Sequence, residues 1–206
     1  MERGTDRVVC GLVVATSAIG LFMIFDTAAL RPLAEAQDRV LWVAQLLPLP
    51  YWGVVVQPVG ALLFVIGAVG ATAPPPASGG GPTRSQRSAW IDRSEFTAML
   101  TVAALGAVLF LGGFSIPFLP QQVVVAFIAQ AYGEGFATGV CMLLHVGCFA
   151  AKVVGLVWLQ QKIRSARRRR PEFSWTERGV RVLLPLAFAN AAVTGAAILL
   201  LRGEAP

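Results

Sequence analysis

The stretch VVCGLVVATSAIGLFMIF, residues 8–25, contains no Asp, Glu, Lys or Arg. A helical run of about 20 apolar residues can cross the roughly 30 Å hydrocarbon core of a bilayer. A signal peptide is the alternative, but this run exceeds the usual apolar length of about 7–15 residues. Four similar stretches follow, so the predicted spans are residues 8–25, 51–72, 96–118, 136–159 and 182–201. The sequence therefore predicts an all-α membrane protein of five transmembrane helices.

The composition excludes an ordinary soluble domain. Hydrophobic residues make up 56% of the chain and charged residues 14%, against about 25% charged residues in a typical soluble domain. A chain this apolar cannot cover a water-facing surface with polar groups, whereas a lipid-facing surface needs few of them. The whole chain, residues 1–206, is interpreted as a single membrane domain.

The net charge of +6 is concentrated in particular loops. The predicted loops 73–94 and 160–179 are basic, and the loop 119–135 has no Lys or Arg. Because basic loops stay in the cytoplasm, this pattern places the N-terminus in the cytoplasm and the C-terminus in the periplasm. The protein is thus predicted to be a multi-pass protein of the bacterial inner (plasma) membrane.

The two basic loops differ in character. Residues 73–94 include PPP and SGGGP and are predicted to form a flexible cytoplasmic linker. The loop 160–179 anchors the topology and could contact anionic lipid headgroups or an acidic protein partner, whereas nucleic acid is not expected. Its strongest basic run is Arg167, Arg168, Arg169 and Arg170.

Several residues inside or beside the predicted spans favour close helix packing. A proline within a span frees a backbone carbonyl that neighbouring helices must satisfy, and glycines let two helices approach closely. The residues that we assign to helix packing are Gln57, Pro58, Gly112, Gly113, Pro185 and Asn190.

The sequence predicts no catalytic residue, metal site or cofactor held by this chain alone. It contains no Gly-rich phosphate loop, no triad-like spacing and no Cys/His cluster. Its cysteines, Cys10, Cys141 and Cys148, all fall inside predicted spans, where buried thiols usually behave as small apolar groups. No disulfide is expected.

Four stretches resemble, in the same order, segments of the H subunit of respiratory complex I, the NADH–quinone oxidoreductase. The family reads IVEAQ, QPLGFLLF, AEYxNM followed by TLFLGGW, and KVLLPLALANLLVTG. The chain reads LAEAQ at 33–37, QPVGALLF at 57–64, SEFTAMLT at 94–101 with LFLGGF at 109–114, and RVLLPLAFANAAVTG at 181–195. Lys152 and Trp158 also fall where the family has a Lys and a Trp. The resemblance covers most of this chain but only the C-terminal part of the family.

One loop departs from the family pattern. The family has an acidic loop, AETNRAPFDLPEAE, whose carboxylates line its quinone cavity, whereas this chain reads ATAPPP at 71–76 and then carries Arg84 and Arg87. The chain is therefore not expected to reduce quinone by itself. It would be a truncated gene, a shortened paralogue or one half of a split protein, with a separate chain supplying the missing N-terminal helices.

Three ionisable residues are candidates for a proton path, because charges in or beside a span are costly. Glu95 matches a glutamate on the family's polar axis, or it is simply a carboxylate favoured at a helix N-terminus. Lys152 either serves that axis or extends towards the headgroups. His145 is either a proton relay or, more in keeping with its depth, a neutral side chain bonded to a neighbouring helix.

The resemblance implies a membrane-arm subunit of an NADH–quinone oxidoreductase, at the junction of quinone reduction and proton translocation. Its partners would be other complex I-like subunits and membrane lipids, with quinone reached only through the complex. Two alternatives remain: an anchor subunit of a membrane-bound hydrogenase or formate-hydrogenlyase-type complex, and a non-catalytic scaffold that has lost the quinone site.

Overall fold

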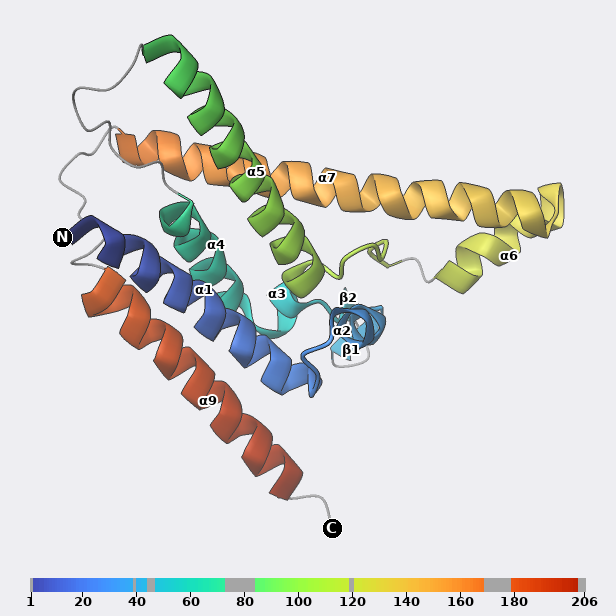
Figure 1. Cartoon of the computed structure of the whole chain (residues 1–206). Helices are drawn as coiled ribbons and strands as arrows, with labels where there is room; N and C mark the ends of the chain where they lie inside the picture. Colours follow the sequence, from blue (N-terminus) through green and yellow to red (C-terminus); the bar gives the residue numbers. More distant parts are fainter. Residues whose placement is uncertain are drawn as a thin grey trace.

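The computed structural model of the protein describes residues 2–38, 40–43, 47–72, 84–118, 121–168 and 179–203. Within these ranges the chain is mainly helical (Figure 1). The longer helices are α1 (Glu2–Phe25), α4 (Pro58–Ala71), α5 (Arg84–Phe110), α7 (Glu134–Arg168) and α9 (Leu184–Gly203). The shorter ones are α2 (Leu30–Gln37), α3 (Gly53–Val56), α6 (Gln121–Tyr132) and the π-helix η1 (Gly179–Leu183).

A small hairpin corrects the all-α prediction. Strands β1 (Val40–Val43) and β2 (Leu47–Pro50) pair antiparallel, with Val40 opposite Pro50. The run VLWV of β1 consists of β-branched, aromatic and other apolar residues, which favour an extended strand. The long apolar segments of the described residues are nevertheless mainly helical.

Four of the described helices are long and apolar enough to cross a membrane. They are Arg7–Phe25, Arg93–Phe110, Glu134–Ala166 and Arg181–Leu200. Four of the five predicted spans therefore have a matching helix. The predicted span 96–118 is too long, because α5 ends at Phe110 and the chain then turns through Gly112 and Gly113.

The predicted span 51–72 is broken in the structure. It consists of α3 and α4, which are separated at Gln57, where φ is −135° and ψ is 68°. Pro58 has no N–H to continue the helical hydrogen-bond ladder, which explains the break. The 14 residues of α4 extend only about 21 Å at 1.5 Å per residue. Helix α4 alone is therefore too short to be a fifth full-length span.

Two predicted loops are partly helical. Residues 73–83 of the expected linker 73–94 lie outside the described residues, but residues 84–94 form the beginning of α5. Residues 160–168 of the expected basic loop 160–179 continue α7, so Arg167 and Arg168 belong to its last turn. Arg169 and Arg170 lie outside the described residues.

Helix α1 packs between α4 and α9. Cys10 contacts Val69, and Leu21 packs in the same cluster as Ala61, so α1 and α4 are antiparallel. Figure 1 shows α9 running beside α1 in the same direction. The main core lies where α1, α2, α4 and α5 meet, and its buried members are Leu21, Leu33, Ala61, Phe64, Leu109 and Phe110.

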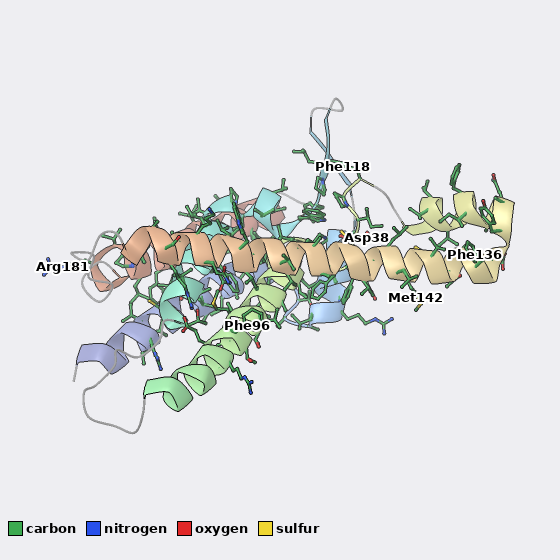
Figure 2. All side chains as sticks on the ribbon, turned by 90° about the horizontal axis from the view of Figure 1, so that it is seen from above. Asp38, Phe96, Phe118, Phe136, Met142 and Arg181 are labelled. Carbon is green, nitrogen blue, oxygen red and sulfur yellow. The ribbon has the colours of Figure 1, made fainter. Side chains whose placement is uncertain are left out.

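Helix α5 crosses α7 and packs against it, whereas the first half of α7 extends beyond the other long helices with only α6 beside it (Figure 1). Most of its side chains there, including Phe136 and Met142, are exposed (Figure 2), whereas Ala137 and Cys141 are buried. Exposed apolar side chains are expected on a helix whose neighbours are lipid tails or other membrane helices.

Candidate functional site

The C-terminal end of α5 is the place where most polar contacts between helices gather. Gly112 and Gly113 have φ values of +70° and +54°, a left-handed conformation that glycine adopts without strain. The N–H groups of Leu111 and Gly113 both donate to the carbonyl of Ala107. Other carbonyls at this helix end must find partners elsewhere, since lipid offers none.

Gln37, the last residue of α2, satisfies part of this helix end. Its side chain is 1% exposed, and its Nε2 donates to the carbonyl of Leu109 at 2.8 Å. Its Oε1 accepts from the backbone N–H of Gly112 at 2.9 Å and from that of Gly53 at 3.4 Å. A single amide therefore joins the ends of α2 and α5 to the start of α3.

Lys152, in the middle of α7, satisfies further carbonyls. Its Nζ donates to the carbonyl oxygens of Leu111 (2.7 Å), Gly113 (3.1 Å) and Ser115 (2.6 Å). It also lies 4.3 Å from the ring centroid of Trp52, whose Nε1 donates to the hydroxyl of Ser115. Lys152 is therefore held against the end of α5 by these contacts.

Asp38 is a charged neighbour of this cluster that is absent from the residues predicted from the sequence. It caps the C-terminal end of α2 and interacts electrostatically with His145 and Lys152. Partial desolvation raises the pKa of the Asp38 carboxyl above its usual value, and the electrostatic effects of His145 and Lys152 oppose that rise. Its position directly after Gln37 is the only signal of this role in the sequence.

His145 is bonded within its own helix. Its Nδ1 lies 2.7 Å from the carbonyl oxygen of Cys141, one turn earlier, and 3.4 Å from the Cys141 sulfur. Because a carbonyl only accepts, Nδ1 carries the hydrogen in this contact. The expected bond to a neighbouring helix is thus replaced by a bond to the backbone of α7.

Glu95, in the first half of α5, forms an ion pair with Arg164 of α7. The two side chains are 18% and 14% exposed. The second terminal nitrogen of Arg164 donates to both the carbonyl and the hydroxyl of Thr72, at 2.7 Å each. Thr72 caps α4, so this pair ties α4, α5 and α7 together. In the sequence alone, Arg164 is only one of the charges of a predicted loop.

The three proton-path candidates are therefore not brought together. Glu95 pairs with Arg164, which follows Lys152 by 12 residues on α7. This separation corresponds to about 18 Å along the helix. His145 lies a further 7 residues, or about 10 Å, from Lys152. Within the described residues, no group of three His, Cys, Asp or Glu side chains could hold a metal ion.

Three of the residues assigned to helix packing, Gln57, Pro58 and Asn190, lie at or near the break between α3 and α4. Gln57 lies between the glycines at positions 20 and 60, where an added Cβ would collide with its side chain. Its Nε2 donates to the hydroxyl of Thr194 at 3.3 Å, and that hydroxyl donates to the carbonyl of Asn190. The break therefore joins α1 and α9, whereas Pro185 lies in the first turn of α9, after η1.

Comparisons with known proteins agree with the resemblance. The chain is 29% identical over 94% of its length to the H subunit of the NADH-quinone oxidoreductase of Thermomicrobium roseum. It is 27% identical over 87% of its length to an H subunit of the same enzyme from Rhodopseudomonas palustris. It is 25% identical over 93% of its length to the H subunit of the same enzyme from Flavobacterium psychrophilum. No family model matches the chain.

The chain spans about half the length of the curated relatives it matches, with shares of 49%, 53% and 53%. The predicted resemblance to the H subunit, limited to part of that protein, is confirmed. All three relatives are bacterial. Together with the four apolar helices, they confirm the prediction of a multi-pass protein in a bacterial inner membrane.

Proposed function

We propose that this chain is a membrane-arm subunit of an NADH–quinone oxidoreductase, supporting the junction between quinone reduction and proton translocation. One observation carries the proposal: the stretches that resemble the H subunit contact each other in the fold. Gln37 of the first stretch bonds Gly112 of the third, and Gln57 of the second bonds Thr194 of the fourth. Such polar contacts between distant stretches go beyond what a shared apolar composition would produce.

The proposed topology has five passes, with the N-terminus in the cytoplasm and the C-terminus in the periplasm. Successive long helices run in opposite directions, as an alternating path requires (Figure 1). Helix α4 is short, and the break at Gln57 lets α3 complete the second pass. Non-helical backbone is tolerated at membrane depth where protein surrounds it, and Gln57 is buried.

In this role the chain supplies structure to the complex, and quinone is reached only through the other subunits. Glu95 and Arg164 hold the end of α4 against the first half of α5, at the face where the family's acidic loop would begin. Of the three proton-path candidates, Glu95 is neutralised by Arg164, and Lys152 has its three N–H groups engaged. These contacts favour a supporting role over proton transfer by this chain.

The same contacts favour a second candidate function, a membrane scaffold that has lost the quinone site. A guanidinium bonded to Thr72 stands beside the position of Ala71, where the family has a glutamate. In either case the proposed partners are other membrane subunits and lipids. The exposed apolar sides of α7 and α9 provide area for these contacts.

The test is affinity purification of the tagged chain from gently solubilised native membranes, followed by mass spectrometry. An unrelated multi-pass protein with the same tag, purified from the same membranes, is the control. Co-purification of NADH–quinone oxidoreductase subunits is expected, and hydrogenase subunits in their place would assign the chain to that type of complex. Recovery of the chain alone, while the same membranes contain an intact complex, would contradict the proposal. The second candidate function, a membrane scaffold, would then be favoured.

A further inference from the structure

The end of α5 gathers three backbone carbonyls around one point. The left-handed backbone at Gly112 and Gly113 folds the chain back after α5, so the carbonyls of Leu111, Gly113 and Ser115 all reach the same nitrogen atom. An ammonium group has three N–H donors, and here it meets three acceptors. The match is complete, with N···O distances of 2.6–3.1 Å.

The chemistry of this cage suits a cation with a single positive charge. Its ligands are neutral carbonyl oxygens and the face of Trp52, which attracts cations through its π electrons. Asp38 acts on Lys152 electrostatically, but among the described residues no carboxylate lies within ion-pair distance of Nζ of Lys152. Divalent cations are usually held by carboxylates, whereas rings of carbonyls replace the hydration shell of monovalent ions.

We propose that the end of α5 is a binding site for one monovalent ammonium-type cation, and that Lys152 is the tethered cation that fills it. The cation neutralises the partial negative charge of the helix C-terminus and fixes the loop after α5. Lys152 is thus a positioning residue that acts through the carbonyls it binds. This inference concerns the isolated chain and does not depend on the complex in which it works.

The test replaces the side chain of Lys152 by a free ammonium ion in solution. Lys152→Ala removes three carbons and the ammonium, the same groups that n-propylammonium contains. The full chain in detergent is melted in n-propylammonium, sodium or choline chloride at equal ionic strength. We expect the variant to melt roughly 5–10 °C below the wild type in sodium chloride, since three charged hydrogen bonds are lost.

n-Propylammonium should restore about half of this loss, whereas choline, which has no N–H donor, should restore none. Lys162→Ala is the matched control, because Lys162 also lies over a ring, 5.3 Å from the centroid of Trp158, but is exposed. Neither this control nor the wild type should respond to n-propylammonium. An equal response in all three proteins, or none in Lys152→Ala, would overturn the proposal.

A second variant decides the role of charge if Lys152→Ala does not fold in any of the three salts. Lys152→Gln keeps N–H donors and removes the positive charge. The proposal expects it to melt several degrees below the wild type in every salt. A melting temperature equal to that of the wild type would show that the carbonyls need only a hydrogen-bond donor, and the cation site would be refuted.

Discussion

Gln37 and Gly112 are joined by a 2.9 Å hydrogen bond from the backbone N–H of Gly112 to the side-chain Oε1 of Gln37, across 75 residues of sequence. The same side chain donates to Leu109, so it serves both a donor and an acceptor of the α5 terminus. Neither group has access to water, since Gln37 is buried. The loop after α5 thus depends on a residue that belongs to another helix.

Gln37→Leu should therefore lower the stability of the chain considerably. The substitution leaves a buried N–H and a buried carbonyl without partners, which costs roughly 2–4 kcal/mol in free energy of unfolding. The measurement is reversible unfolding in mixed micelles. Gln161→Leu, the same change at an exposed position of α7, should cost less than about 0.5 kcal/mol. Equal effects of the two substitutions would show that the Gln37 contacts contribute nothing.

The Glu95–Arg164 pair should show a measurable coupling energy. A double-mutant cycle with Glu95→Gln and Arg164→Gln is expected to give about 1–2 kcal/mol, because both side chains are mostly buried and Arg164 also bonds Thr72. The Arg31–Glu35 pair on α2 is the control, being 91% and 65% exposed. Its coupling should stay below about 0.5 kcal/mol. A Glu95–Arg164 coupling as small as that of the control would contradict its role as a tie between helices.

Gly112→Ala should destabilise the chain for two reasons. A Cβ at this position would collide with Trp52 and Ser115, and the left-handed backbone costs about 1–2 kcal/mol for a residue other than glycine. A total loss of roughly 2–4 kcal/mol is expected in thermal or denaturant unfolding. At Gly147 an added Cβ meets nothing within 4 Å, so Gly147→Ala should be neutral or slightly stabilising. If both variants have the same free energy of unfolding, the expected collision of a Cβ at position 112 with Trp52 and Ser115 is wrong.

Asp38 should give the chain a pH-dependent stability in the acid range. Its folded-state pKa is raised, so folding favours the protonated carboxyl. The stability that it contributes is present below the unfolded-state pKa of 3.8 and is lost as the pH rises through the folded-state value. The stability of the wild type relative to Asp38→Asn should therefore fall as the pH rises. A difference that grows with pH would show that His145 and Lys152 dominate over desolvation.

The apolar runs are enough to predict four of the helices, because crossing a bilayer requires a local property that can be counted along the chain. The prediction is wrong where a single residue changes the backbone. Pro58 is unusual inside a span, yet the predicted span runs through it, and the structure breaks there. Gly112 and Gly113 are assigned from the sequence to close packing of helices, but they end α5 by their positive φ values.

The candidate site can be predicted only in part, because its contacts join residues far apart in sequence. The sequence leaves Lys152 either at the headgroups or on an inward polar axis, and no pattern identifies the three carbonyls that hold it. Arg164 looks like one charge of a basic loop, since nothing local marks it as the partner of Glu95. Such pairings depend on how helices cross, which a single sequence does not display.

The distance in sequence between Gln37 and its partners also sets an order of events during synthesis. Ribosomes add roughly 5–20 residues per second, so Gly112 is made roughly 4–15 s after Gln37, which it follows by 75 residues. Lys152, which completes the same helix end, comes later still. During that interval the amide of Gln37 lacks the partners that it has in the folded chain. The contacts at the end of α5 can be completed only after Lys152 has been made.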